Sequence, residues 1–197
     1  MSSPLTVSQW RQVSRTLAAA FQDDPVFSWL IPNDAARARA LPRYFAVEVR
    51  HLALHFGCSN GVVEGGDVLS AAIVLPPGEW STSAGSLVKH GPALVAALRG
   101  RWFRGGRLLG EIERHHPHTE HYYFPYIGVS PTAQGRGLGT ASMRPALDRC
   151  DAEGLPAYLE ASNPRCAKLY ERLGFETLRE IRPLGAPPLQ LMLRPPS

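Results

Sequence analysis

The chain has 197 residues, of which 44% are hydrophobic and 19% are charged, and its formal net charge is +4. These values are typical of a globular chain with one core, so we expect a single domain over residues 1–197. No apolar run reaches the ~20 residues that a membrane-spanning helix needs, and the small, dispersed charge does not favour nucleic-acid binding.

The cysteines and the N-terminus bear on the cellular compartment. Cys58, Cys150 and Cys166 are odd in number and far apart, which fits neither a disulfide framework nor a zinc site. The N-terminus has no basic segment followed by an apolar one, so no secretory signal is expected. These features predict a cytoplasmic protein.

In chain order, the first part of the sequence predicts two helices and a hairpin. Thr6 and Gln9 match a capping box, and apolar residues then recur at helical spacing. A second amphipathic helix is predicted from Asn33 to Phe56. The segment Val62–Leu75 predicts two strands that are joined at Gly65-Gly66-Asp67.

The middle of the chain, from Trp80 to Pro117, has the weakest pattern. Apolar residues suggest a helix within Leu87–Leu98 and another turn or two around Leu108–Ile112. The basic segment Arg99–Arg107 contains an Arg-Gly-Gly run with aromatic residues, a composition that can bind single-stranded RNA. A lone copy is more typical of a solvated connector, so an RNA-binding module is kept only as an alternative.

The most informative pattern is a glycine-rich loop between a predicted strand, Glu120–Val129, and a predicted helix, Leu138–Glu153. This order places backbone N–H groups and a helix dipole where they can hold an anion. The loop lacks the Gly-Lys-Ser/Thr ending of a nucleotide P-loop and the three spaced glycines of a Rossmann fingerprint. The same helix contains Pro145, which should kink it.

The spacing Gln134-x-x-Gly137-x-Gly139 resembles the acyl-CoA loop of the GNAT superfamily of N-acetyltransferases. The resemblance implies that the loop binds the pyrophosphate of coenzyme A. The residues concerned are Gln134, Gly135, Arg136, Gly137, Leu138, Gly139 and Thr140.

A second motif supports the same family. The run Leu159–Pro164, followed by Leu169–Phe175, is similar to the second coenzyme-binding motif of GNAT proteins. The resemblance implies that Tyr170 lies near the thioester sulfur and can protonate the leaving thiolate, and that Asn163 supports the pantetheine arm. The run Arg15–Phe21 also resembles the start of puromycin N-acetyltransferase and its relatives.

The resemblance implies an α/β (α+β) fold with a mixed, mainly antiparallel central sheet flanked by helices. In this fold the sheet is splayed between the strand ending at Val129 and the strand Ala157–Ser162. The backbone of Ile127, Gly128 and Val129 would bind the acetyl oxygen and the pantetheine. Two further strands, Phe175–Ile181 and Leu189–Leu193, complete the sheet.

The expected activity is transfer of an acetyl group from acetyl-CoA to a primary amine of a small molecule, such as an antibiotic or other xenobiotic. The amine would attack directly in a ternary complex. A protein or peptide amine is an alternative acceptor, and a non-catalytic acyl-CoA-binding module is an alternative class. The acceptor's identity and the oligomeric state, a homodimer included, are left open.

The general base is the least determined part of this prediction. Several GNAT relatives place a glutamate six residues before the position of Val129, and here that position is Tyr123. Glu160, on the adjacent strand, is the best remaining candidate. It could instead be a structural carboxylate paired with an arginine, or the proton could leave through Tyr123 or His121.

Two other groups of residues could form a metal site or line an acceptor pocket. The cluster His115, His116, His118, Glu120 and His121 is interrupted by Pro117, and we expect no physiological metal site there. Five aromatic residues are available to line an acceptor pocket: Phe21, Phe27, Trp29, Tyr44 and Trp80.

Overall fold

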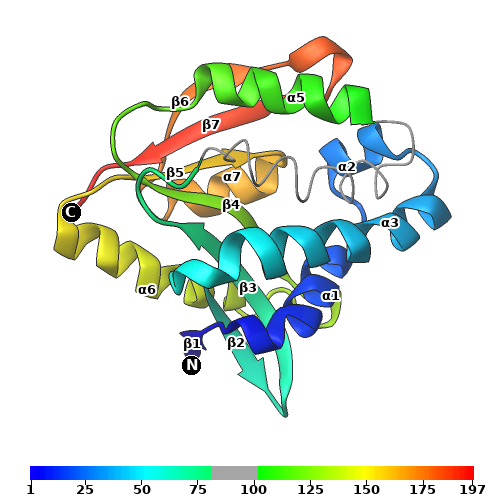
Figure 1. Ribbon diagram of the computed structural model, residues 1–197. Helices are drawn as coiled ribbons and strands as arrows, with labels where there is room; N and C mark the ends of the chain where they lie inside the picture. The colour runs from blue at the N-terminus through cyan, green and yellow to red at the C-terminus, as the bar shows by residue number, and fades with distance from the viewer. Residues whose placement is uncertain (81–101) are drawn as a thin grey trace.

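The computed structural model describes residues 1–80 and 102–197, and its centre is a seven-stranded sheet (Figure 1). The strand order is β1-β2-β3-β4-β5-β7-β6, and the pairs are antiparallel except for β4 and β5, which are parallel. The bounds are β1 (Ser2–Pro4), β2 (Asn60–Glu64), β3 (Asp67–Leu75), β4 (Tyr122–Val129), β5 (Ala157–Ala161), β6 (Glu176–Ile181) and β7 (Leu189–Arg194). The predicted mixed, mainly antiparallel sheet is confirmed.

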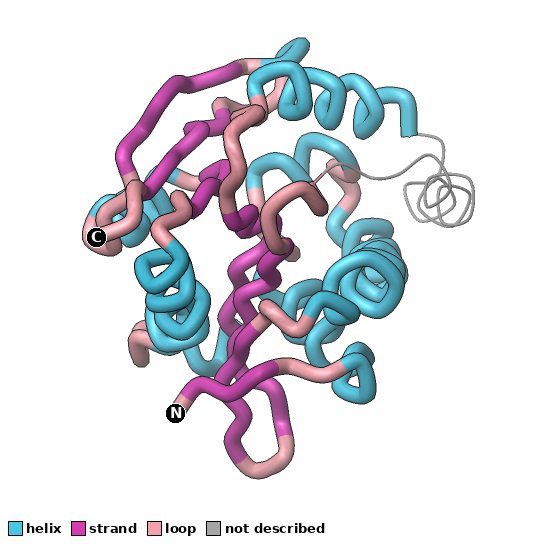
Figure 2. Tube along the Cα trace, turned by 60° about the vertical axis from the view of Figure 1, so that its left-hand side comes forward, coloured by secondary structure: helices cyan, strands magenta, loops and turns pink. Residues whose placement is uncertain are grey.

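Helices cover both faces of the sheet (Figures 1 and 2). They are α1 (Trp10–Ala20), α2 (Pro25–Leu30), α3 (Asp34–Val47), α5 (Trp102–His115), α6 (Leu138–Glu153) and α7 (Pro164–Glu171). Buried residues of α1, α2, α3 and α5 form one hydrophobic cluster, and buried residues of α6 and α7 form a second. The sheet therefore separates two layers, which we call the α3 face and the α6 face.

The local signals near the N-terminus act as predicted. The backbone N–H of Thr6 donates to the Gln9 side chain at 2.9 Å, which completes the capping box before α1. Gly65 and Gly66 have φ angles of 59° and 90°, and they join β2 to β3 in a two-residue turn. This turn type needs two residues in the left-handed region, which glycine adopts without steric cost.

The predicted helix from Asn33 to Phe56 does not continue in one register. The α-helix ends at Val47 and is followed by a π-helical turn, Glu48–Ala53, and a 3-10 turn, Leu54–Phe56. A π turn takes up an extra residue, so the apolar stripe of α3 no longer faces the core at its end. Phe56 is accordingly exposed.

Three elements were missed or shortened in the sequence prediction. The edge strand β1 and the short helix α2 were not predicted, although Asp24-Pro25 is a typical helix start.

The segment Leu87–Leu98 lies outside the described residues. The helix α5 has 14 residues rather than a turn or two, so residues Trp102–Arg107 of the basic segment are helical and not a solvated connector. The helix α6 continues through Pro145.

The strands β4 and β5 pair only at their beginnings. Tyr122 pairs with Ala157 and Tyr123 pairs with Tyr158, after which β4 follows β3 as far as Val129 and β5 follows β7. The two strands therefore part, and beyond Tyr123 the β4 backbone is not paired with β5. The predicted splay of the sheet is confirmed.

A bulge marks the place where the strands part. Between Ile73 and Leu75, β3 has one residue, whereas β4 has two residues, Phe124-Pro125, between Tyr123 and Tyr126. The extra residue bends the strand. Pro125 also has no N–H, so β4 cannot donate a ladder hydrogen bond at this residue.

The close packing of α1 on β4 gives a prediction for stability. A Cβ atom at Gly128 would lie 2.9 Å from Leu17 Cδ2 and 3.0 Å from Ala20 Cβ. The variant Gly128→Ala should therefore lose about 1–3 kcal/mol of unfolding free energy, measured by denaturant titration. In the control Gly110→Ala, on the exposed side of α5, the added Cβ meets no atom within 4 Å. That variant should gain about 0.5–1 kcal/mol. Equal midpoints for Gly128→Ala and the wild type would contradict the packing argument.

Candidate active site

The loop between β4 and α6 leaves an open backbone surface at a helix N-terminus. Gly135 and Gly137 have φ angles of 79° and 74°, and a Cβ atom at either would meet no atom within 4 Å. Gly137 is the N-cap of α6, and no described side chain caps this end. The first N–H groups of α6, starting at Leu138, therefore face outward together with the positive end of the helix dipole. This arrangement fits a phosphate-bearing ligand.

Two side-chain contacts hold the loop in place. Arg136 Nη2 lies 2.9 Å from both carboxylate oxygens of Glu64, so this predicted coenzyme ligand has a protein partner for its side chain. The Ser70 hydroxyl donates to the Leu138 carbonyl at 3.2 Å and lies 2.6 Å from the Ser142 hydroxyl. The first turn of α6 is thereby fixed to β3.

The other predicted coenzyme residues border the gap between β4 and β5. Ile127, Gly128 and Val129 lie on β4 beyond the last pair with β5, so their backbone groups on that side are not used by a neighbouring strand. Asn163 follows β5, and its side-chain oxygen accepts the Arg165 N–H at 2.9 Å as the cap of α7. Its side-chain oxygen is thus already used as a helix cap.

Tyr170 lies on α7 in the same buried cluster as Ala161 of β5, and Ile127 of β4 packs against that cluster. It therefore lies on the α6 face of the sheet. Burial raises the pKa of the Tyr170 hydroxyl above its usual value, and the charges of Cys166 and Asp24 raise it further. The hydroxyl remains protonated and can act as a hydrogen-bond donor.

Asp24 connects the start of α2 to the end of β5. One carboxylate oxygen accepts the N–H groups of Val26 and Phe27, and the other accepts a short hydrogen bond from the Ser162 hydroxyl. Burial raises the pKa of this carboxyl, and the three hydrogen bonds oppose the shift. Asp24 thus places a carboxylate close enough to influence Tyr170.

Glu160 is the centre of a buried polar network on the α3 face. Tyr123 donates its hydroxyl hydrogen to Glu160 Oε2 at 2.8 Å. The other oxygen, Oε1, is buried and accepts no hydrogen bond of normal geometry in the described part of the chain, and the same holds for the nearby Tyr158 hydroxyl, whose pKa is raised by burial and by Glu160. His116 Nδ1 lies 3.6 Å from Glu160 Oε1, too far for a hydrogen bond. Burial and the nearby Glu160 charge raise the pKa of Tyr123, so its hydroxyl stays a donor.

Two histidines and a tryptophan extend this network. The Nε2 atoms of His116 and His121 are 2.9 Å apart, and His121 Nδ1 lies 2.7 Å from the Thr119 carbonyl oxygen. Trp80 stacks on His116 with the ring centres 4.0 Å apart. Burial lowers the pKa of His121, which favours its neutral form. The network therefore contains the candidate base Glu160 and both alternatives, Tyr123 and His121.

The structure also bears on the other interpretations of these residues. Glu160 has Tyr123 and His116 as neighbours rather than the arginine that a structural role suggested. Among residues 1–80 and 102–197, no group of three or more His, Cys, Asp or Glu side chains is arranged to hold a metal ion. In the same residues, no helix is long and apolar enough to cross a membrane.

A second carboxylate, Glu48, was not identified from the sequence. It lies in the π-helical turn and faces the Tyr126 hydroxyl, which is 2.7 Å from the Tyr44 hydroxyl. Burial raises the pKa of Glu48 to about 7, and the Tyr126 hydroxyl opposes this shift. Around these groups pack the rings of Phe21, Phe27 and Phe45. The sequence feature that could have indicated this buried carboxylate is a glutamate placed one helical turn after Tyr44 on an apolar helix.

The five aromatic residues proposed for an acceptor pocket are divided among three places. Phe21, Phe27 and Tyr44 belong to the cluster around Tyr126, with ring centres 5.3–6.3 Å apart. Trp80 covers His116, and Trp29 lines a separate cavity. All three places lie on the α3 face, the side of the sheet on which the buried Glu160 side chain lies.

The two groups of candidate residues approach the gap from opposite faces of the sheet. Side chains alternate along a strand, so Glu160 shares the face of Tyr158, which belongs to the α3-face cluster. Leu159 and Ala161 point the other way, toward the cluster that contains Tyr170. A ligand bound in the gap could therefore meet a carboxylate on one side and a tyrosine hydroxyl on the other.

Comparison with known proteins identifies the family of the chain. The family model for GNAT acetyltransferases matches residues 68–175. An uncharacterized N-acetyltransferase of Schizosaccharomyces pombe is 28% identical over 205 residues, covering 95% of this chain and 80% of that protein. The matched segment is more than half of the chain, so the chain belongs to the GNAT acetyltransferase family.

Solved structures share the fold over the full length. A histone acetyltransferase and related acetyltransferase from Corynebacterium glutamicum gives a TM-score of 0.75 at 24% identity and covers 100% of this chain and 96% of that one. The Drosophila melanogaster polyamine N-acetyltransferase, which catalyses formation of N-acetylagmatine, gives 0.65 at 16% identity and covers 99% of both chains. Identities this low establish the fold and leave the acceptor undetermined.

The environment of Glu48 predicts a pH-dependent stability difference. Its pKa of about 7 in the folded protein is above the reference value of 4.5, so the folded state is penalised for ionising it. This penalty is fully present above pH 7 and disappears as the pH falls toward 4.5. Glu48→Gln should therefore melt at a higher temperature than the wild type at pH 8, and the difference should shrink at lower pH.

The exposed Glu113 on α5 provides the matched control. Glu113→Gln should show no such pH-dependent difference in melting temperature. A difference for Glu48→Gln that is constant between pH 5 and pH 8 would show that Glu48 is not held in an environment that opposes its charge.

Proposed function

We propose that the protein transfers the acetyl group of acetyl-CoA to a primary amine of a small molecule, by direct attack in a ternary complex. The observation that carries this proposal is the buried carboxylate of Glu160 beside the gap between β4 and β5, whose Oε1 accepts no hydrogen bond of normal geometry from the described residues and lies 3.6 Å from His116 Nδ1. A buried carboxylate oxygen that accepts no hydrogen bond is costly, and an incoming amine would supply the missing donor.

The coenzyme would occupy the α6 face and the gap. The loop Gln134–Thr140 would hold the pyrophosphate with its backbone N–H groups, since the space beside Gly135 and Gly137 is open. The unpaired β4 backbone at Ile127–Val129 would bind the pantetheine and the acetyl oxygen in place of a neighbouring strand. A thioester held there needs only orientation toward the amine, which supplies much of the rate in a two-substrate reaction.

Glu160 would act on the acceptor amine from the α3 face. Its Oε1 would accept a proton from the amine, while Tyr123 holds Oε2 by a hydrogen bond. His116 and His121 lie on the same side and offer a route by which the proton could leave the site. Tyr123 is therefore a positioning residue for Glu160 in this proposal.

Tyr170 would act on the leaving thiolate from the α6 face. Because burial raises the pKa of its hydroxyl, complete proton transfer to a thiolate of much lower pKa is unfavourable. A hydrogen bond from this hydroxyl to the developing negative charge on sulfur has no such cost. Tyr170 would thus stabilise the thiolate until solvent or the acceptor's proton neutralises it.

A small acceptor is supported by the aromatic residues on the α3 face, because aromatic lining is typical of small-molecule sites. Because Arg15–Phe21 resembles the start of puromycin N-acetyltransferase, antibiotic-like amines are among the acceptors to test. We place the reaction in the cytoplasm, where the free thiols of Cys58, Cys150 and Cys166 would stay reduced. Turnover of acetyl-CoA with a panel of amines, followed by release of free thiol, tests the activity itself.

The loop assignment is tested by a pair of glycine variants at the two ends of α6. Gly137 has a φ of 74° and Gly154 a φ of 67°, and both have open space where a Cβ would lie. Gly137→Val should weaken acetyl-CoA binding at least ~tenfold in calorimetry, because the side chain occupies the phosphate position. Gly154→Val carries the same backbone strain and should keep the wild-type affinity. Equal acetyl-CoA affinities for the two variants would show that the coenzyme does not bind at this loop.

The role of Glu160 is tested against a similar tyrosine–glutamate pair nearby. Tyr122, next to Tyr123 in β4, donates to Glu153 at 2.7 Å outside the proposed site. Glu160→Gln should lower kcat/KM by ~10²–10⁴-fold, because an amide cannot accept the proton of the amine. Glu153→Gln should keep the wild-type kcat/KM. A Glu160→Gln enzyme with the wild-type kcat/KM would show that the amine arrives neutral or loses its proton elsewhere.

A further inference from the structure

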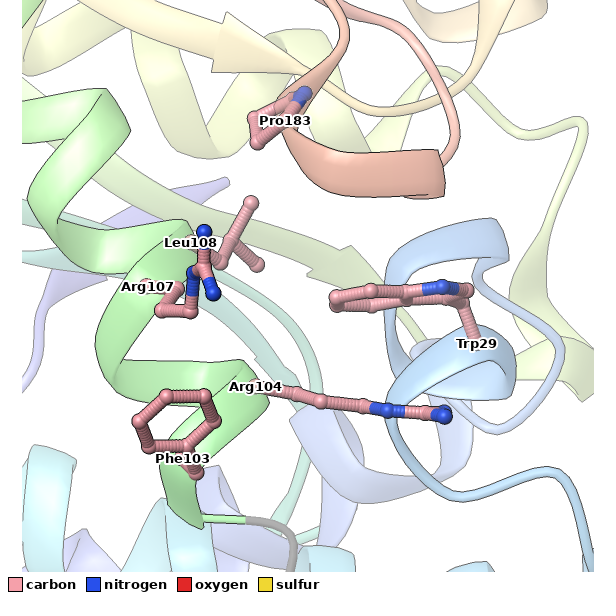
Figure 3. A pocket seen from close by; sticks show the side chains of 6 residues that line it. All are labelled: Trp29, Phe103, Arg104, Arg107, Leu108 and Pro183. Carbon is pink, nitrogen blue, oxygen red and sulfur yellow. The ribbon is translucent and has the colours of Figure 1, made fainter.

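A cavity of about 270 Å³ lies on the α3 face between α2, α5 and the 3-10 turn Pro183–Gly185 (Figure 3). Its lining consists of Trp29, Phe103, Arg104, Arg107, Leu108 and Pro183. Leu108 and Pro183 are buried, whereas the two arginines are exposed. The cavity therefore combines an apolar lining with two positive charges at its opening.

Aromatic rings hold the two guanidinium groups at this cavity. The guanidinium carbon of Arg104 lies 5.7 Å from the centre of the Trp29 ring, and that of Arg107 lies 5.6 Å from the centre of the Phe103 ring. In this arrangement the N–H edges stay available for hydrogen bonds. Within the described ranges, no carboxylate forms an ion pair with either arginine. The pair is suited to bind a carboxylate or phosphate group.

Both helices that border the cavity lead to the proposed reaction centre. Trp29 is five residues along α2 from Asp24, about 7.5 Å at helical rise, and Asp24 bonds to Ser162 at the end of β5. Arg107 is nine residues before His116, roughly 14 Å by the same measure, and His116 faces Glu160. The cavity is therefore on the acceptor side of the gap.

We propose that this cavity binds an anionic group of the acceptor while the acceptor's amine lies at Glu160. The inference rests on the proposed acetyl transfer and narrows its substrate class. Preferred acceptors are amines that carry a carboxylate or phosphate on the order of 10–15 Å from the reacting nitrogen. Arg104 and Arg107 determine this specificity, and Trp29 packs against the chain or ring that joins the two charged groups.

The test compares ω-amino carboxylates, from 4-aminobutanoate to 12-aminododecanoate, with n-alkylamines of the same chain length. For the longer chains, the wild-type KM should be about tenfold lower for the amino carboxylate than for the alkylamine. For 4-aminobutanoate no such advantage is expected, because its carboxylate cannot reach the arginines from Glu160. The double variant Arg104→Gln/Arg107→Gln should lose the advantage and keep the wild-type kinetics with alkylamines.

A control variant on the same helix separates the cavity from general charge effects. Arg114 is exposed on α5 and pairs with Glu111. Arg114→Gln should keep the preference for long amino carboxylates. An equal KM for amino carboxylates and alkylamines in the wild type, or a preference that survives in the double variant, would overturn the proposal.

A binding measurement separates this proposal from the proposed function. Decanoate has the anionic group but no amine, so it should bind the wild-type cavity in calorimetry and bind the double variant at least ~tenfold more weakly. Arginine-dependent decanoate binding without acetylation of any amine would contradict the acetyl-transfer proposal and leave the anion site standing. Acetylation of alkylamines, together with decanoate binding that does not depend on the arginines, would contradict the anion site and leave the acetyl-transfer proposal standing.

Discussion

The parting of β4 from β5 is the constraint on which the rest of the site depends. A parallel pair of strands is held together by evenly spaced hydrogen bonds between the N–H and C=O groups of both strands. Here the bulge at Phe124-Pro125 bends β4, and Pro125 removes one donor, so pairing stops after Tyr123. The backbone beyond this point is left with hydrogen-bonding groups that a ligand can use. A continuous ladder would leave no space between the two faces.

The site is built in two different ways on its two sides. On the α6 face, the features that fit a coenzyme are mainly backbone features: an uncapped helix start, two glycines at positive φ and an unpaired strand edge. On the α3 face the features are side chains, namely Glu160 with its histidines, Glu48 with two tyrosines, and the two arginines of α5. The first kind of feature suits phosphate and peptide-like groups, and the second kind suits a ligand of particular charge and shape.

This difference explains how much the sequence could predict. The glycine loop Gln134–Thr140 and the motif around Tyr170 are local in sequence, so their glycine spacing and order were enough to indicate the fold, and the structure confirms that fold. The α3 face is assembled from segments far apart in the chain. Glu160 contacts His116, which is 44 positions earlier (160 − 116). Glu48 meets Tyr126 only because a π turn replaces the expected helix. The predicted strand Glu120–Val129 contains Pro125, but only the register shows that pairing with β5 ends before this residue.

The proline and the glycines also bear on how such a protein can diverge. Their effect is a property of the main chain, so it does not depend on what the surrounding side chains are, provided that the sheet still folds. Substitutions in α2, α5 or the π-helical turn can therefore accumulate without altering Pro125, Gly135 or Gly137. Descendants of one ancestral gene can keep the same acyl donor while their second substrates change. In a protein built this way, a change of acceptor requires changes in side chains only, whereas a change of acyl donor would require a change in the course of the main chain.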